Sequence, residues 1–182
     1  MSLDRIENPP IPLSKTPILK LMLISYTLSM MVGKGEFMAR IKLEKCDSPI
    51  FTTDWDVTIS QINYGNHMGN DSFLAMAHEA RMRFFASHNL SELSLFGSAL
   101  IMSDAAVMYR SEVKWGEKLK ITLMIKDIQE YGFDFIYGIS SLEDQREVAR
   151  IKTGMNFFDY QQKKLYRADE SFLNKLRQIA LS

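Results

Sequence analysis

The stretch VTISQINYGNHMGNDSFLAMAHEARMRFF, residues 57–85, passes from an alternating apolar pattern through a polar junction into a helical pattern. From about Asp71 to Ser87, apolar side chains recur every three or four residues and form one stripe, as in an amphipathic helix. The members of this stripe are Phe73, Met76, Ala77, Ala80 and Phe84. A helix of this length spans roughly 25 Å, and a ten-residue strand spans roughly 33 Å. A sheet of such strands is therefore long enough to wrap the helix.

The opposite side of this predicted helix is mixed rather than polar. The apolar residues Leu74, Met82 and Phe85 are interspersed there with His78, Glu79, Arg81 and Arg83. A monomer would expose part of this apolar surface to water. We therefore expect the sheet on one side of the helix and a partner subunit on the other. At the helix start, Asn70, Asp71 or Ser72 can act as the cap.

Alternating apolar residues predict strands on both sides of the helix. Before it, Trp55, Val57 and Ile59 share one face of a strand at 54–60. After it, the predicted strands lie at about 100–110, 118–126, 133–139 and 147–159, and a second helix follows at 170–181. The gaps between the later strands are short and polar, so neighbouring strands run antiparallel. The sequence therefore predicts an α+β fold with a long helix on one face of an antiparallel sheet.

The 182 residues suffice for one domain and its core. All five prolines lie within the first 49 residues, which divides the chain into an N-terminal extension, about 1–37, and a compact domain, about 38–182. The apolar run at 21–32 is shorter than the roughly 20 residues that a membrane-spanning helix needs. We expect it to be an amphipathic helix, or a stretch upstream of a start at Met38, and we expect no membrane span.

Charge and cysteine content narrow the expected partners. The formal net charge is zero, so neither nucleic acid nor an anionic membrane surface is an expected partner. The single cysteine, Cys46, excludes an intrachain disulfide framework and fits a cytoplasmic location. The three histidines lack the carboxylate spacing of a metal site, so no metal is expected.

The order of these elements, and the residues at the junction, resemble the hotdog-fold thioesterases, especially the 4-hydroxybenzoyl-CoA thioesterases and related short acyl-CoA thioesterases. The resemblance covers about Thr52 to Leu176, and rests on residues 57–85, on VKWGEKLKI at 113–121 and on REVARIKTGMNFFD at 146–159. It implies a hotdog fold, with a long central helix wrapped by an antiparallel sheet of about five strands. It also implies a homodimer or a dimer of dimers whose sheets pair edge to edge, with sites at the dimer interface.

The function that this resemblance implies is hydrolysis of an acyl-CoA or acyl-carrier thioester, with no cofactor besides the CoA of the substrate. One position departs from the family's pattern. These thioesterases usually carry an aspartate where Asn63 stands, and often another where Gln61 stands, so the usual nucleophile or general base is missing. Two alternatives therefore stay open. One is an acyl-CoA-binding module without catalysis, and the other is a hydratase or dehydratase of the same fold, whose His/Glu pair His67 and Glu79 loosely match.

The junction has features that suit thioester chemistry. A thioester carbonyl gains negative charge during hydrolysis, and the unpaired N–H groups of the first helical turn, near Asn70, can stabilise it. Gly69 has no side chain and lets a ligand approach the backbone, and Asp71 is a candidate for binding substrate. In the family, the corresponding positions often hold the histidine and asparagine that are His67 and Asn70 here.

The attacking group has several candidates. His67 is a candidate general base for water, because an imidazole is available in its neutral form near pH 7, with Asn63 or Asn70 orienting that water. Glu79 is a second candidate base, and it can equally form a helical ion pair with Arg83 four residues later. Asp71 is a third carboxylate. Candidates for binding the CoA phosphates are Arg110, Lys114 and Arg150.

Overall fold

The computed structural model describes residues 40–181. The predicted extension at 1–37, with its apolar run at 21–32, lies outside the described residues. The domain boundary near residue 38 therefore stays a prediction.

Five long strands form an antiparallel sheet in the order β1-β3-β4-β5-β2, and a two-residue strand, β6, pairs with β5. The strands are β1 (Phe51–Asp56), β2 (Ala99–Tyr109), β3 (Lys118–Gln129), β4 (Gly132–Ser141), β5 (Glu147–Asp159) and β6 (Lys164–Leu165). The predicted antiparallel sheet of about five strands is confirmed. One edge of the sheet is β1, and the other is the 11-residue strand β2.

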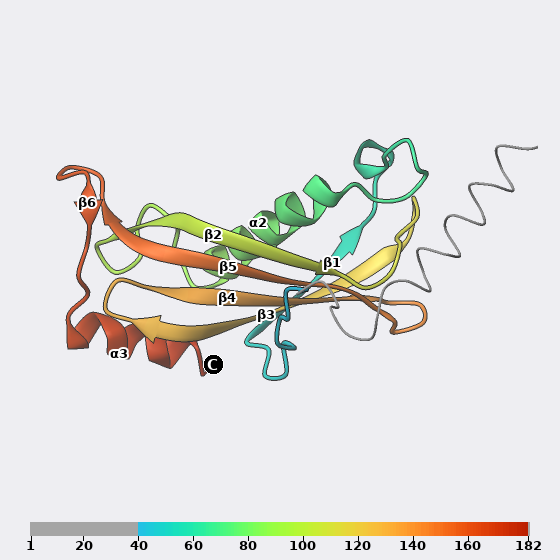
Figure 1. Ribbon diagram of the computed structural model, residues 1–182. Helices are drawn as coiled ribbons and strands as arrows, with labels where there is room; N and C mark the ends of the chain where they lie inside the picture. The colour runs from blue at the N-terminus through green and yellow to red at the C-terminus, as the bar shows by residue number, and fades with distance from the viewer. Residues whose placement is uncertain (1–39, 182) are drawn as a thin grey trace, which may run out of the picture. The chain divides into compact units, whose positions relative to one another are not determined.

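The long helix α2 (Asn70–Ser87) lies along one face of this sheet (Figure 1). All five residues of the predicted apolar stripe are buried. At the centre of the contact, the ring of Phe84 lies 5.8 Å from the ring of Phe51 and 5.8 Å from that of Phe135. Such edge-to-face aromatic pairs add to the free energy of burial. The predicted pairing of one helix with one sheet face is therefore confirmed.

Two residues assigned to the mixed side of α2 are buried, which corrects the sequence prediction. Phe85 is 1% exposed and Arg81 is 5% exposed. The Phe85 ring packs 5.7 Å from the ring of Phe135 on β4, and the loop after the helix folds back over Arg81. The backbone N–H of Leu90 donates to the carbonyl of Phe85 at 2.8 Å, and Glu92 pairs with the Arg81 guanidinium. The sequence periodicity of a helix cannot predict contacts made by residues outside that helix.

The first strand is also shorter than predicted. It ends at Asp56, and Ile59, which was expected on the buried face, is 66% exposed. The short 3-10 helix η1 (Ile59–Gln61) turns the chain away from the sheet at this point. The Gln61 side chain holds the turn, because its Oε1 accepts from Trp55 Nε1 at 3.1 Å and from the Thr58 backbone N–H at 2.9 Å.

The C-terminal helix α3 (Glu170–Ile179) closes one end of the core. The Asp169 side chain caps it by accepting from the Phe172 N–H at 2.8 Å. The Phe172 ring then packs 4.7 Å from the ring of Phe157 on β5. Leu43, which precedes β1, contacts β5 through its carbonyl oxygen, which accepts from the Arg150 guanidinium at 2.8 Å.

Candidate functional site

The polar junction is a tight loop between η1 and α2. The Asn63 N–H donates to the His67 carbonyl at 2.9 Å, and the Gly69 N–H donates to the Gln61 carbonyl at 2.8 Å. Asn66 lies in the left-handed region, with φ at 58°, a conformation that asparagine tolerates better than most residues. These contacts fix the loop beside the N-terminus of α2.

Helix α2 begins without a side-chain cap. Gly69 occupies the cap position, so no side chain is available there to bond the first turn. The prediction that Asn70, Asp71 or Ser72 caps the helix is therefore wrong. Asn70 is the first helical residue, and the Ser72 hydroxyl donates back to the Gln61 carbonyl at 3.4 Å. The uncapped first turn presents backbone donors and the positive end of the helix dipole.

A cavity of about 280 Å³ opens beside this helix start. It is lined by His67, Met68, Asn70, Phe73, Tyr109, Arg110, Ser111, Glu112 and Val113. The structure thus brings two of the predicted site residues, His67 and Asn70, to one hollow. Met68 and Phe73 also line it from the junction and α2, and the remaining residues come from the end of β2 and the loop that follows it. That loop is tied to the junction, because the Met68 N–H donates to the Val113 carbonyl at 2.8 Å.

Three other predicted site residues lie outside the cavity lining. Gly69 is buried, and a Cβ there would come 2.7 Å from Asp71 Oδ1, so this chain's own side chain occupies the space beside it. Asp71 itself is exposed. Glu79 lies further along α2, where its carboxylate pairs with Arg83 at 2.9 Å. This is the helical ion pair that was the alternative to a catalytic role for Glu79.

Asn63 also lies outside the lining, but it contacts the His67 ring. Its Oδ1 accepts from the Gly65 N–H at 2.8 Å, and this bond turns the amide so that Nδ2 faces His67 Nδ1 at 3.3 Å. The same ring nitrogen lies 3.3 Å from the Met68 carbonyl oxygen. The Asn63 side chain therefore helps to fix the orientation of the imidazole through Nδ1, the ring nitrogen that faces the loop backbone.

Tyr109 is a site residue that the sequence interpretation missed. Its hydroxyl donates to the Asn70 carbonyl at 3.1 Å, and its ring packs 5.2 Å from that of Phe73. Burial raises the pKa of the Tyr109 phenol, and the negative charge of Asp71 raises it further, so the hydroxyl stays a donor. Only its place at the end of a predicted strand could have pointed to it.

Of the three cations proposed for CoA phosphates, Arg110 alone lines the cavity. It pairs with Glu147 at 3.1 Å. Lys114 pairs with Glu112 at 2.9 Å on the loop after β2. Arg150 pairs with the same Glu147 at 2.6 Å and donates to the Leu43 carbonyl at 2.8 Å. Arg110 is therefore the cation best placed to meet an anionic group of a ligand in this cavity.

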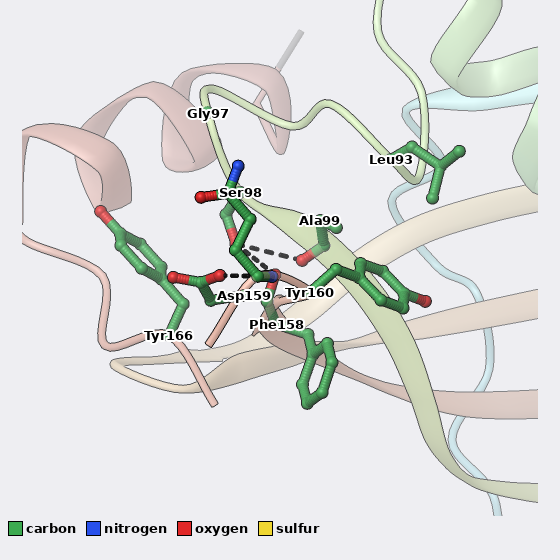
Figure 2. A pocket seen from close by; sticks show the side chains of 9 residues that line it. Leu93, Gly97, Ser98, Ala99, Phe158, Asp159, Tyr160 and Tyr166 are labelled. Carbon is green, nitrogen blue, oxygen red and sulfur yellow. Dashed lines mark hydrogen bonds between the residues drawn. The ribbon is translucent and has the colours of Figure 1, made fainter. Parts of the chain in front are cut away.

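A second cavity, of about 340 Å³, lies at the start of β2 (Figure 2). Its wall combines aromatic and polar side chains, and it is lined by Leu93, Gly97, Ser98, Ala99, Phe158, Asp159, Tyr160, Gln161 and Tyr166. Asp159 Oδ1 is already bonded by the backbone N–H groups of Gln161 and Gln162, each at 2.9 Å. The two cavities therefore stand at opposite ends of the same edge strand.

Residues 40–181 contain neither a cluster of metal ligands nor a helix suited to spanning a membrane. In this range no group of three or more histidine, cysteine or carboxylate side chains is arranged to hold a metal ion. In the same range no helix combines the length and the apolar character needed to cross a bilayer.

Comparison with known proteins assigns the fold. A family model described as the thioesterase-like superfamily matches residues 57–176. No curated protein matches the sequence significantly. Among solved structures, Slr0204, a 1,4-dihydroxy-2-naphthoyl-CoA thioesterase from Synechocystis, shares 22% identity at a TM-score of 0.62, over 72% of this chain and 94% of that one.

Two further structures have the same arrangement. SAV2348 from Staphylococcus aureus, solved in complex with CoA, shares 22% identity at a TM-score of 0.62, over 71% of this chain and 83% of that one. A thioesterase superfamily protein from Jannaschia sp. CCS1 shares 13% identity at a TM-score of 0.64, over 74% of this chain and 85% of that one. At these identities the likeness establishes the fold alone, and it confirms the predicted hotdog fold.

Proposed function

Because the chain belongs to the thioesterase-like superfamily, we propose that it hydrolyses an acyl-CoA thioester by attack of water on the carbonyl carbon. One observation carries the proposal. The uncapped start of α2 adjoins a cavity of about 280 Å³ that His67 also lines. A helix start with free donors is suited to a carbonyl oxygen that gains negative charge.

The residues around the cavity divide the work of hydrolysis. The N–H groups at Asn70 and Asp71 stabilise the oxyanion, since these first-turn positions have no partner within the helix. The Tyr109 hydroxyl bonds the Asn70 carbonyl and holds that turn in place. His67 lines the cavity with an imidazole, which can hydrogen-bond the substrate or the attacking water, and Asn63 orients it.

CoA as the carrier is supported by two of the similar structures. One of those proteins is a naphthoyl-CoA thioesterase, and another was solved with CoA bound. In this chain, the Arg110 guanidinium at the cavity wall suits an anionic group of CoA. An acyl-carrier thioester remains the alternative, and a cytoplasmic location is part of the proposal.

We also propose that the active form is a homodimer, or a dimer of such dimers, paired through the β2 edge. The 11 residues of β2 run from Ala99 to Tyr109, so Asp104 is the middle one. Antiparallel pairing of two copies about Asp104 would set Ala99 of one copy opposite Tyr109 of the other. Ala99 lines the second cavity and Tyr109 lines the first, so the two cavities would adjoin across the dimer. Ligand pockets usually have volumes of roughly 300–1,000 Å³, so each cavity alone is small for a ligand, and the two together would form a site of more usual size.

The test of the function is thioester cleavage by the full chain, measured with acyl-CoA substrates of several acyl lengths. We expect turnover by the wild type, a large loss on His67→Ala and little change on Glu79→Ala, because Glu79 pairs with Arg83 outside the cavity. Loss on Glu79→Ala with retention on His67→Ala would overturn this assignment of the site.

Two other outcomes would replace the proposal. Measurable acyl-CoA affinity without turnover would make the protein an acyl-CoA-binding module, a function that the missing aspartates at positions 61 and 63 favour. Hydration of an enoyl thioester without hydrolysis would make it a hydratase or dehydratase.

A further inference from the structure

The missing aspartates leave the hydrolytic water without an obvious proton acceptor. Gln61 cannot serve, because its side chain is neutral and bonds Trp55 and Thr58. Asn63 is neutral as well and bonds Gly65 and His67. Neither side chain can become a base, so any carboxylate base must come from another part of the fold.

The orientation of His67 also limits its use as the base. The Asn63 amide is oriented by the Gly65 N–H, so its Nδ2 faces His67 Nδ1, and the Met68 carbonyl oxygen lies 3.3 Å from the same ring nitrogen. A neutral imidazole that accepts at Nδ1 carries its proton on Nε2. In the tautomer that accepts from Asn63, Nε2–H is a donor, so the ring offers the cavity no acceptor for a water proton.

The cavity contains one carboxylate within its lining, that of Glu112. Glu112 follows β2 and stands on the loop that the Met68–Val113 backbone bond, at 2.8 Å, ties to the junction. His67 directly precedes Met68 in the chain, and Glu112 directly precedes Val113, so this backbone bond brings their two loops together. Both side chains line the same hollow from neighbouring loops, with Asn70 on the same wall.

The surroundings of Glu112 keep it ionised. Lys114 Nζ lies 2.9 Å from Glu112 Oε2. This hydrogen bond and the charge of Lys114 lower the pKa of the Glu112 carboxyl. The carboxylate is therefore the dominant form at neutral pH, which is the form that can accept a proton.

We propose that Glu112 is the general base of the thioesterase reaction and takes over the role of the absent loop aspartate. This inference rests on the proposed function. The water oxygen bonds to the thioester carbonyl carbon while one water proton passes to Glu112. The C–S bond then breaks, the thiolate leaves with the electron pair, and Glu112 returns the proton to sulfur. The products are one carboxylic acid and one thiol, and the carboxylate of Glu112 is regenerated.

The experiment compares kcat/KM of the full chain with that of three variants on the acyl-CoA substrate that the wild type cleaves best. Glu112→Gln keeps the size and removes the base, and we expect a loss of about 100-fold or more. Glu112→Asp keeps the carboxylate and should recover part of that loss. Glu143→Gln is the matched control, because Glu143 is an exposed carboxylate on the β4–β5 turn.

A pH profile distinguishes catalysis from a structural role of Glu112. Lys114→Gln removes the cation that lowers the pKa of Glu112, so the pKa of the base rises. Because the base acts in its ionised form, the acid limb of kcat/KM should move to higher pH. Glu143→Gln should leave the acid limb in place.

The possible outcomes distinguish a failure of the Glu112 proposal from a failure of the proposed thioesterase function. Wild-type turnover with Glu112→Gln within about threefold of wild type would overturn the inference and leave the thioesterase proposal standing. An unmoved acid limb in Lys114→Gln would also overturn it. Absence of wild-type turnover on every thioester would overturn both.

Discussion

Asn63 Nδ2 lies 3.3 Å from His67 Nδ1, and this contact joins the position where the family usually has an aspartate to the one imidazole that lines the cavity. The neighbouring Gly65 N–H occupies Asn63 Oδ1 at 2.8 Å. An amide held in this way can only donate to the ring. A carboxylate in the same place would accept from it.

Asn63→Asp should therefore change the state of His67. The new carboxylate would accept from Nδ1–H, which frees Nε2 to act as a base. We expect kcat/KM to rise by about tenfold, well within the range that general base catalysis provides. Nitrogen NMR of the imidazole should show the proton on Nδ1 in the variant. A large loss of activity would argue against a carboxylate-like role at position 63.

The bond between Tyr109 and the first turn of α2 gives a second prediction. Tyr109→Phe removes the hydroxyl that donates to the Asn70 carbonyl and keeps the ring against Phe73. We expect a loss of about 0.5–1.5 kcal/mol in the free energy of unfolding. We also expect a lower kcat, because the oxyanion donors are less well held.

Tyr131→Phe is the matched control for this change. Tyr131 is 46% exposed and Tyr109 is 45% exposed, so the two substitutions remove similarly exposed hydroxyls. Urea unfolding and steady-state kinetics give the two readouts. An equal effect of both substitutions would show that the Tyr109 bond contributes nothing specific to the helix start.

The sequence predicts those parts of the fold whose pattern is local. Alternation identifies the buried face of β3, where Leu119, Ile121 and Leu123 are each at most 1% exposed. The recurrence of apolar residues every three or four positions likewise identifies the buried stripe of α2. These residues are buried by the sheet and helix as whole layers, so the period of the element alone decides which side chains face the core.

The sequence fails where burial depends on a partner far along the chain. Arg81 reads as a surface residue within its helix, but a loop residue, Glu92, and a residue of β4, Tyr137, meet its guanidinium. In the same way, the junction motif contains His67 and Asn70, whereas Tyr109 and Glu112 reach the cavity from another strand and loop. The period of one element carries no information about these contacts.

The buried Arg81–Glu92 pair gives a third prediction. Among residues 40–181, Glu92→Ala leaves the Arg81 cation with the Tyr137 hydroxyl, 3.3 Å away, as its side-chain partner. We expect a loss of about 3 kcal/mol in the free energy of unfolding, because an unpaired buried charge is costly. Arg81→Met removes that charge, so the double variant should lose less than the sum of the two single losses.

An exposed ion pair on the same helix is the control for this cycle. Glu79 and Arg83 have side chains 47% and 42% exposed, respectively. Glu79→Ala should change the free energy of unfolding by less than about 1 kcal/mol. Additive effects of Arg81→Met and Glu92→Ala would show that the buried pair is not coupled.

The β2 edge gives the last prediction, on assembly. Met102, Ser103, Asp104 and Ala105 are exposed at the middle of this strand, where a second copy would pair. Light scattering at micromolar concentration should give at least twice the mass of one chain. Ala105→Glu should lower that mass, because the two copies would bring like charges together near the symmetry axis, beside Asp104.

The matched control places the same charge far from this edge. Ser171→Glu adds a carboxylate to the exposed first turn of α3, and we expect it to leave the mass unchanged. If the cavities at the two ends of β2 form one site across the dimer, Ala105→Glu should lose thioesterase activity in step with the loss of mass. A wild-type monomer would contradict the proposed pairing. A monomeric Ala105→Glu variant with full activity would show that one chain alone holds the complete site.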